Sequence, residues 1–353
     1  MTEESTNGWL TFLSGQGARF SGSDPNELES FDGAPAAGRD MLAALTDVGL
    51  IAASGDDAAA FLHAQLTNDV AGLGQDAARL AGYCTPKGRL LATMLMWRAG
   101  ETVMLQLPRQ LQPAIQKRLQ MYVLRAKAKL EDAGERHAVL GLAGPGAAAA
   151  LAPWFPDAGA LAVPYAKAGS AAGTLIRLAD ADGAPRYQWV TDPQTAMEAW
   201  PRLATTLRPA GLPAWRLLDI HAGIPRITSA TQEQFVPQMI NYEAIGGVNF
   251  RKGCYPGQEI VARSQYLGKQ KRRMMPATVL ADRVEPGMEV FSSADPGQPC
   301  GLVVNAEPSG QGRFDCLVET KTAALDSGSV HLGAPGGPAL EFGALPYPLA
   351  EPA

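Results

Sequence analysis

Short apolar runs separated by turn residues constrain the fold of this chain more than any other feature of its sequence. Residues 80–84, 90–97 and 102–107 are strand-like runs joined by glycine-containing turns, a pattern typical of consecutive antiparallel strands. Further along the chain, strand-like and helix-like segments alternate. The 38 glycines and 27 prolines among 353 residues agree with a chain of many turns. This mixed order predicts α+β units rather than one doubly wound sheet.

The pattern changes after about residue 276. Five short strand-like runs follow, at 277–280, 288–291, 301–305, 314–318 and 330–332, with glycine and proline turns between them. Such a series predicts a small antiparallel β-barrel or sandwich. At the other end, residues 1–38 lack periodicity and are rich in glycine, serine, aspartate and proline. We therefore predict a poorly ordered arm at 1–38, an α+β core at 39–273 and a C-terminal barrel at 274–353.

Charge and cysteine content limit the class of protein. The net charge is −5, so we expect no general attraction to nucleic acid or anionic lipid. No stretch approaches the roughly 20 apolar residues that span a bilayer, and the polar N-terminus does not resemble a secretory signal. The four cysteines show no paired spacing, which favours a reduced, cytoplasmic location.

One of these cysteines, Cys254, stands in an unusual segment, Lys252-Gly253-Cys254-Tyr255-Pro256-Gly257. Residues 251–273 contain seven basic side chains and one acidic side chain, Glu259, and clustered cations favour thiolate over thiol. The two glycines give the backbone freedom to turn beside the sulfur. We predict that Cys254 is the working thiol, whereas Cys84, Cys300 and Cys316 lie in apolar contexts typical of buried cysteines.

Several common site types are not encoded. The histidines at 63, 137, 221 and 331 are dispersed, so neither a zinc site nor a complete Fe–S site can be written from the sequence. If Cys254 binds a cluster, the other ligands must come from a partner, a second copy or a small thiol. The sequence contains no GxSxG motif, P-loop or GxGxxG phosphate loop.

The cysteine segment also carries a resemblance. Residues 252–263, KGCYPGQEIVAR, resemble the signature of the YgfZ family of folate-binding proteins that act in Fe–S cluster assembly and repair. Pro256 replaces the threonine or serine that is common there. The resemblance extends through FLHAQLTNDV at 61–70, YCTPKGR at 83–89, FVPQ at 235–238 and the Leu345-Pro346-Tyr347 sequence near the end.

Membership implies a fold shared with the aminomethyltransferase of the glycine cleavage system. That fold is a cloverleaf of mixed α/β units around a central folate opening, and it ends in a small antiparallel β-barrel. The implied ligand is tetrahydrofolate or a derivative. The implied partners are Fe–S carrier or client proteins, including tRNA-modifying enzymes, and a transient cluster shared with one of them could use Cys254 as a ligand.

The resemblance also assigns roles to individual residues. Lys252 and Arg263 would tune the thiol, while Gln258 and Glu259 would shape its loop. Trp215 falls where the family places an indole against folate, and an indole can stack on a planar pterin. It could equally anchor the helix predicted at 215–221. Further folate-site residues would be Asn68, His221 and Gln258, and the basic run would suit a polyglutamate tail.

Four positions depart from the related families. A second folate-contacting tryptophan would align with Val48. Aminomethyltransferases carry an acidic pair where this chain has Leu91 and Ala92, and His221 stands where glutamate is usual. The predicted function is therefore a tetrahydrofolate-binding accessory factor rather than a classical enzyme. The alternatives are a folate-dependent one-carbon transferase and an RNA-modification factor that uses residues 269–273 on phosphates; the overall charge argues against direct RNA binding.

Overall fold

The structure is a computed structural model that describes residues 3–33, 40–266 and 270–349. The chain divides into two compact units, each assembled from separate stretches. The first comprises Met1–Ala58, Gly72–Arg79 and Leu95–Leu218, and the second comprises Ala59–Ala71, Leu80–Met94 and Asp219–Ala353. No helix within the described ranges is long and apolar enough to cross a membrane.

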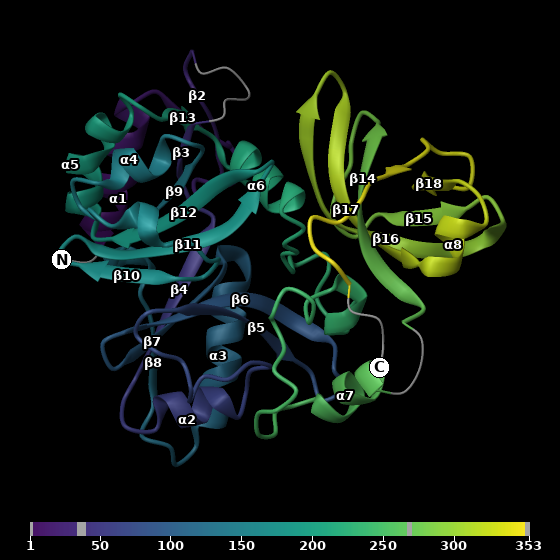
Figure 1. Ribbon diagram of the computed structural model, residues 1–353, viewed down its shortest axis with the longest axis horizontal. Helices are drawn as coiled ribbons and strands as arrows, with labels where there is room; N and C mark the ends of the chain where they lie inside the picture. Colours follow the sequence, from purple (N-terminus) through teal and green to yellow (C-terminus); the bar gives the residue numbers. More distant parts are fainter. Residues whose placement is uncertain (1–2, 34–39, 267–269, 350–353) are drawn as a thin grey trace. The chain divides into compact units, whose positions relative to one another are not determined.

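A six-stranded sheet forms the centre of the first unit. Its strand order is β10-β11-β12-β9-β3-β13, and every pair is antiparallel except β3 with β13. Helix α4 packs against β12, and α5 packs against β9 (Figure 1). Asp192 caps α5 by accepting a 2.9 Å hydrogen bond from the Thr195 amide, and a proline follows it at the first turn, so the helix begins at Pro193. The elements are β3 (Met41–Ala44), β9 (Ala138–Ala143), α4 (Ala147–Leu151), η3 (Ala158–Ala160), β10 (Lys167–Ser170), β11 (Gly173–Ala181), β12 (Ala184–Thr191), α5 (Pro193–Leu203), β13 (Arg208–Ala210) and α6 (Leu212–His221).

The prediction of a poorly ordered N-terminal arm is wrong for the described part of residues 1–38. Residues 3–33 form α1 (Glu3–Gly15) and the hairpin of β1 (Ala18–Phe20) and β2 (Leu28–Phe31). Trp9 lies edge-on to Trp200 of α5 at a centroid distance of 5.8 Å, and Phe31 stacks on the same indole at 5.5 Å. Aromatic burial offsets the entropy of ordering these residues. Residues 1–2 and 34–38 lie outside the described residues.

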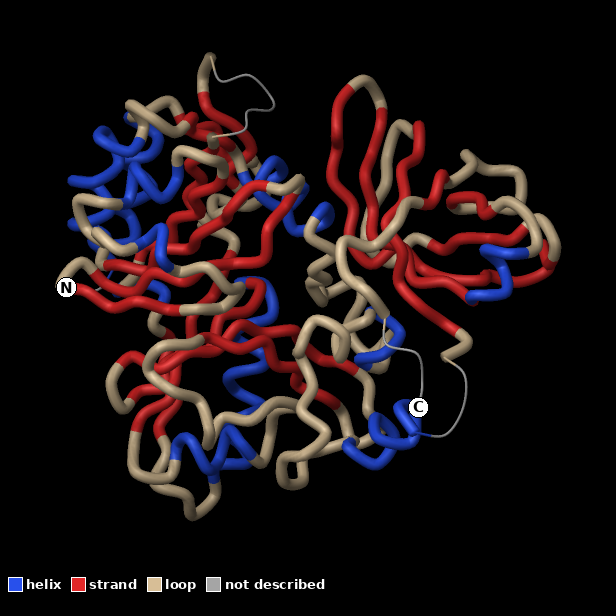
Figure 2. Tube along the Cα trace, viewed as in Figure 1, coloured by secondary structure: helices blue, strands red, loops and turns tan. Residues whose placement is uncertain are grey.

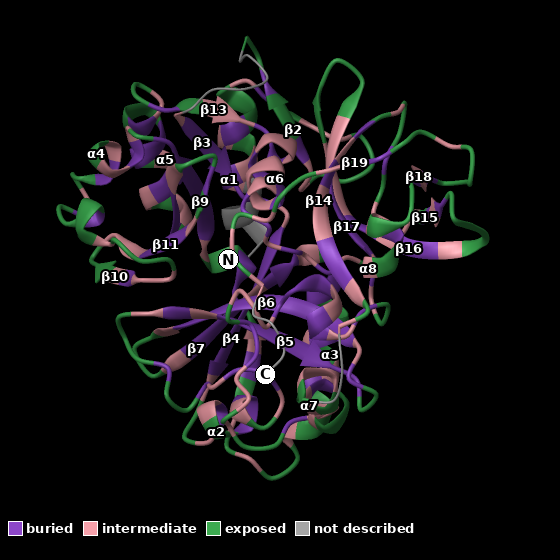
Figure 3. Cartoon of the chain, turned by 45° about the vertical axis from the view of Figure 1, so that its right-hand side comes forward, coloured by how far each residue is buried: buried purple, intermediate pink, exposed green. Residues whose placement is uncertain are grey.

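A second sheet has five strands in the order β5-β6-β7-β4-β8. Its central strands are almost wholly buried, and Figure 3 shows β4 and β6 mainly in the colour for buried residues. Helix α3 packs against β4 and β8. The predicted strands at 80–84, 90–97 and 102–107 correspond to β5, β6 and β7. The elements are β4 (Val48–Ser54), α2 (Ala58–His63), β5 (Ala78–Cys84), β6 (Leu90–Ala99), β7 (Thr102–Pro108), η1 (Arg109–Leu111), α3 (Gln112–Val123), β8 (Lys129–Asp132) and η2 (Gly134–Arg136).

The chain between α6 and α7 forms loops and turns around the short η4 (Pro237–Ile240), as Figure 2 shows. These loops end in α7 (Gln258–Tyr266), a helix that the sequence analysis did not predict. Within the second unit, the side chain of Tyr242 donates a hydrogen bond to the carbonyl of Ala81 at 3.1 Å. The loop chain is therefore tied to β5 by buried polar contacts.

The second unit ends in a curled antiparallel sheet of six strands, in the order β18-β15-β16-β17-β14-β19 (Figure 1). Valines and other small apolar residues fill its core, including Val290, Val303 and Val318. The predicted C-terminal antiparallel β structure is confirmed, as a half-barrel. The elements are β14 (Arg272–Leu280), β15 (Glu289–Ser292), β16 (Asp295–Gly310), β17 (Arg313–Lys321), α8 (Thr322–Asp326), β18 (Val330–Leu332) and β19 (Glu341–Phe342).

Candidate functional site

Cys254 is the exposed cysteine of the chain. It lies in the loop before α7, whereas Cys84, Cys300 and Cys316 are buried. Burial raises the pKa of both Cys84 and Cys316 to about 12, because a thiolate loses its hydration there. Accessibility therefore distinguishes Cys254 from the other three thiols, as the sequence predicted.

Of the two glycines beside Cys254, only Gly257 is required by the geometry. Its φ is +81°, and a β-carbon there would lie 2.4 Å from the carbonyl oxygen of Thr85 and 2.6 Å from the Cα of Gly88. Gly88 itself has a φ of +72°. By contrast, a β-carbon at Gly253 would meet only His63, at an ordinary contact distance of 3.6 Å. The turn between β5 and β6 and the cysteine loop thus meet glycine to glycine, which joins two segments that carry the family resemblance.

Lys252 clamps the cysteine loop. Its Nζ donates to the carbonyl of His63 at 2.6 Å and to the carbonyl of Gly253 at 3.0 Å, and it lies 4.8 Å from the ring centroid of Tyr255. Burial lowers the pKa of Lys252 to about 8, although the charges of Asp69 and Cys254 act in the opposite direction. Lys252, the predicted tuning residue, is therefore bound to the loop backbone and lies near enough to Cys254 for the charge of the sulfur to affect the lysine pKa.

Tyr255 anchors the loop through its buried side chain, a role that sequence reasoning missed. Only 6% of the residue is exposed, and burial raises the pKa of its hydroxyl, with Cys84 adding to the effect. The loop therefore buries the aromatic residue and exposes the thiol immediately before it. The aromatic residue directly after Cys254 was the available signal, because a large apolar ring favours burial.

The remaining loop-shaping residues lie on α7. Gln258 begins the helix, and its amide donates to the carbonyl of Tyr255 at 3.2 Å. Glu259 is exposed in the first turn, and Arg263 is exposed in the last turn. The helix thus starts directly from the loop, but the guanidinium of Arg263 points to solvent and its tuning of the thiol stays a prediction.

The basic run at 251–273 does not form one open anion site. Arg272 donates to the fully buried carboxylate of Glu319 at 2.8 Å, and Arg273 bonds to Glu243 and to the carbonyl of Gln238. Burial raises the pKa of Glu319 and the pKa of Glu243, and the charge of the paired arginine offsets this rise only in part. Lys269 lies outside the described residues. Two of the seven predicted cations are therefore consumed by internal ion pairs, which the charge count could not reveal.

Asn68 has a structural environment. Its Nδ2 donates to the carbonyls of Leu80 and Gly246, both at 2.7 Å, and its Oδ1 accepts from the Asp69 amide at 2.8 Å. The residue is only 6% exposed. Its amide therefore fixes the chain around Gly246, and a direct folate contact stays a prediction.

Comparison with known proteins assigns this arrangement to a family. The family model described as the GCVT N-terminal domain matches residues 41–245. A tRNA-modifying protein YgfZ of Klebsiella pneumoniae (strain 342) is 35% identical over 246 residues, which make up 69% of this chain and 73% of that protein. The protein of the same name from Enterobacter sp. (strain 638) is 31% identical over 312 residues, 88% of this chain and 94% of its own. The chain belongs to the YgfZ family.

The fold expected of a YgfZ family member is confirmed. The crystal structure of the glycine cleavage system aminomethyltransferase T from Bartonella henselae matches this chain with a TM-score of 0.73. The match covers 95% of this chain and 96% of that protein at 18% sequence identity. At this identity the likeness establishes the fold alone.

Trp215, the predicted folate contact of this YgfZ family chain, lies on α6 and is 4% exposed. A β-carbon at Gly141 would come within 2.8 Å of three atoms of the indole, so the ring lies against the main chain of β9. The guanidinium of Arg186 is 5.4 Å from the ring centroid. The indole is thus held by its own unit, as the anchoring interpretation requires, and its stacking on folate stays a prediction.

His221 faces the C-terminal sheet. Its Nε2 lies 2.8 Å from an Asp315 carboxylate oxygen, and the other oxygen of that carboxylate accepts from Ser309 at 2.8 Å. His221 and Asp315 line a cavity of about 310 Å³ together with Pro276 and Phe342. The residue that replaces the usual glutamate is therefore engaged with β17.

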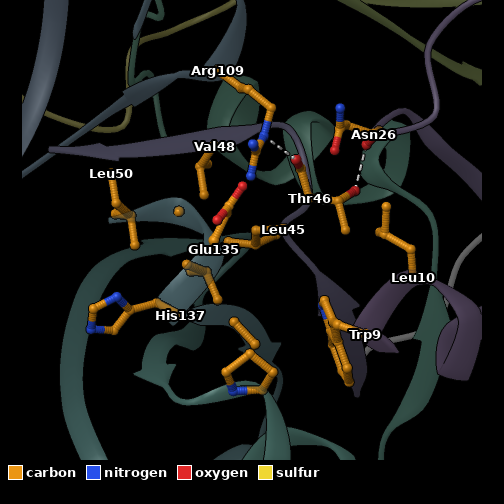
Figure 4. A pocket seen from close by; sticks show the side chains of 14 residues that line it. Trp9, Leu10, Asn26, Leu45, Thr46, Val48, Leu50, Arg109, Glu135 and His137 are labelled. Carbon is orange, nitrogen blue, oxygen red and sulfur yellow. Dashed lines mark hydrogen bonds between the residues drawn. The ribbon is translucent and has the colours of Figure 1, made fainter. Parts of the chain in front are cut away.

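Val48, where the resemblance would place a second tryptophan, lines a cavity of only about 30 Å³ in the first unit (Figure 4). Arg109 crosses this cavity to the carbonyl of Thr46, and the Thr46 hydroxyl donates to the carbonyl of Asn26. Such a volume is of the order of one or two water molecules.

No resident metal site is assembled within residues 3–33, 40–266 and 270–349, where no group of three His, Cys, Asp or Glu side chains could hold an ion. The structure does, however, bring one dispersed histidine to the thiol loop. His63 lies against Gly253 and pairs with Asp69 at 3.1 Å. Sequence reasoning missed this pair, although both residues fall within the 61–70 segment that carries the resemblance.

Proposed function

We propose that this protein is a folate-binding accessory factor that acts through Cys254 in the assembly or repair of Fe–S proteins, including enzymes that modify tRNA. Its relatives are named tRNA-modifying protein YgfZ, and its fold is that of an aminomethyltransferase. A cluster would be a substrate shared transiently with a client protein, and Cys254 would be its ligand from this chain.

The observation that carries the proposal is the exposure of Cys254 on a loop that contacts on both sides of the thiol hold in place. The other three cysteines are buried. Gly257 fixes the turn, Tyr255 anchors it, and Lys252 clamps it to the segment that contains His63. An accessible thiol beside an ammonium suits nucleophilic or ligand-exchange chemistry.

The decisive experiment is complementation of a deletion strain, scored by the activity of Fe–S enzymes and by the modified nucleosides of tRNA. Cys254→Ser should abolish rescue while leaving the melting temperature almost unchanged, since the side chain is exposed. Ser329→Ala, which removes an exposed side-chain hydrogen bond to His331, serves as the control and should rescue fully. Full rescue by Cys254→Ser would overturn the role of the thiol.

Folate binding has its own test. Tetrahydrofolate should bind the purified protein in a calorimetric titration, and Trp215→Phe should weaken that binding by about three- to tenfold, the size of a lost aromatic contact. Trp189→Phe, at a fully buried indole of the same unit, is the matched control and should bind as the wild type does. Equal affinity in all three proteins would remove Trp215 from the site.

The fold also favours a second candidate, a folate-dependent aminomethyl transferase. Against it, the positions that correspond to the acidic pair are Leu91 and Ala92, which are 6% and 0% exposed in β6. A transferase would have to find its carboxylate elsewhere. Turnover of an aminomethyl-loaded carrier at about 1 s⁻¹ or faster, an ordinary enzyme rate, would favour this candidate over the accessory factor.

A third candidate, direct RNA contact by residues 269–273, has less support. Arg272 and Arg273 are engaged by Glu319 and Glu243. Phosphate binding would have to break these ion pairs at the cost of burying uncompensated carboxylates. The tRNA effect is therefore proposed to pass through client enzymes.

A further inference from the structure

The imidazole of His63 lies beside the cysteine loop in a defined orientation. His63 is the last residue of α2, and its Nδ1 is 3.1 Å from a carboxylate oxygen of Asp69. The Ala71 amide donates a hydrogen bond to the same nitrogen at 3.3 Å. The opposite edge of the ring faces Gly253, because a β-carbon there would lie 3.6 Å from Nε2 and 3.9 Å from Cδ2. Asp69 and the Ala71 amide thus both hold Nδ1, and Nε2 lies toward Gly253, the residue before Cys254.

A second contact fixes this arrangement. The main-chain carbonyl of His63 accepts the 2.6 Å hydrogen bond from Lys252, whose ammonium also binds the Gly253 carbonyl. His63 therefore meets the loop twice, with its backbone and with its ring. The charges of Asp69 and Cys254 both act to raise the pKa of Lys252, so the carboxylate and the sulfur each lie within electrostatic range of its ammonium.

We propose that the His63–Asp69 pair is the second half of the thiol site, in which Asp69 orients the ring and Nε2 forms a hydrogen bond to the sulfur of Cys254 or to the group that the sulfur engages. A carboxylate that holds one imidazole nitrogen fixes the direction of the other, which is the arrangement that supports many nucleophiles. Asp69, which acts through the ring of His63, is then a positioning residue. This inference rests on the proposed function, in which Cys254 is the working thiol.

A pair of near-isosteric substitutions separates the two ring nitrogens. In His63→Gln the side-chain amide can reach the position of Nε2, whereas in His63→Asn it reaches only the position of Nδ1. The probe is iodoacetamide, with Cys254 labelling followed by mass spectrometry. In that reaction the sulfur–carbon bond forms as the carbon–iodine bond breaks, iodide leaves, and the thiol proton passes to the medium.

We expect His63→Asn to slow labelling of Cys254 by about three- to tenfold, the effect of one lost hydrogen bond, and His63→Gln to remain within about twofold of wild type. Asp69→Asn should slow labelling to an intermediate degree, because the ring loses its charged partner. His331→Asn is the matched control. Its ring bonds to Ser329 and Gly337 in the C-terminal sheet, and labelling of Cys254 should not change.

A purely structural role would give a different pattern. It would lower the melting temperature and change labelling equally in the Gln and Asn variants. Wild-type labelling of a folded His63→Asn protein would overturn the inference and leave the proposed function standing. If instead Cys254→Ser rescues a deletion strain while the His63 variants label as expected, the pair acts on the thiol but the proposed function fails.

Discussion

The two halves of the basic run, the loop around Cys254 and the start of β14, both contain basic residues but lie in opposite environments. In the loop, Arg251 is exposed, and Lys252 binds two main-chain carbonyls. On β14, Arg272 and Arg273 reach inward to buried carboxylates. The difference teaches that a count of like charges predicts neither a binding surface nor its extent, because a partner distant in sequence decides which charges stay free.

The largest effect is expected when the buried ion pair of Arg272 on β14 is broken. Arg272→Met leaves the carboxylate of Glu319, which is 0% exposed, without its cation and should lower the free energy of unfolding by about 3–5 kcal/mol at pH 7. Arg251→Met in the exposed half should change it by less than about 0.5 kcal/mol. Urea denaturation of both variants gives the comparison. Equal losses would mean that the two halves do not differ as described.

The pH dependence sharpens the same test. The pKa of Glu319 is raised by burial even with Arg272 present, so the folded state binds a proton more readily than the unfolded state does. Stability linked to this group is therefore present at acid pH and is lost as the pH rises through the folded pKa. Without Arg272 the pKa of Glu319 should rise further, because the guanidinium no longer favours the carboxylate. The difference in unfolding free energy between wild type and Arg272→Met should therefore narrow as the pH falls toward 4.5, the ordinary pKa of a glutamate.

The next effect concerns the rigid part of the loop. Gly257→Ala places a β-carbon 2.4 Å from the Thr85 carbonyl at a φ of +81°, and should cost about 2–3 kcal/mol in strain and overpacking. Gly253→Ala, whose β-carbon meets only His63 at 3.6 Å, should cost less than about 0.5 kcal/mol. Thermal melts compare the two. A stable Gly257→Ala protein would show that the loop tolerates another path.

A smaller effect is expected at the clamp. Lys252→Met loses hydrogen bonds to His63 and Gly253 and should cost about 1 kcal/mol. Because the pKa of Lys252 is lowered to about 8, the folded state releases this proton at a pH where the unfolded chain still holds it. Wild-type stability relative to Lys252→Met should therefore rise between pH 8 and about 10.4. Competitive acylation should also find Lys252 reactive near pH 8, and a midpoint near 10 would contradict the burial of its ammonium.

The smallest effect on stability is expected at the thiol itself. Cys254→Ser should change the free energy of unfolding by less than about 0.5 kcal/mol, because the side chain is exposed. Iodoacetamide should label Cys254 first, and Cys84 should resist labelling until the protein unfolds, since its buried thiol has a pKa of about 12. Early labelling of Cys84 would show that the turn between β5 and β6 opens readily.

Local patterns predicted much of the fold. The hairpins of β5, β6 and β7 and the strands of the C-terminal half-barrel follow from apolar runs and turn residues, which act over a few neighbours. Helix α7 was missed because its buried side is a single residue, Val261, among polar and exposed positions. The arm at 3–33 was missed because its order depends on Trp9 and Phe31 meeting Trp200, far along the chain.

The sequence by itself determined that Cys254 stands in a specific glycine-bracketed loop, that the chain belongs with YgfZ proteins, and that no resident metal motif is encoded. These are properties of residue identity and short spacing. Only the tertiary structure decided that Gly257 is required and Gly253 is not, that Arg272 is consumed by Glu319, and that a histidine dispersed in sequence faces the thiol loop. The reason is physical. Burial, close backbone approach and charge pairing depend on which residues come together in space, and the separation of two residues along the sequence does not give their distance in the fold.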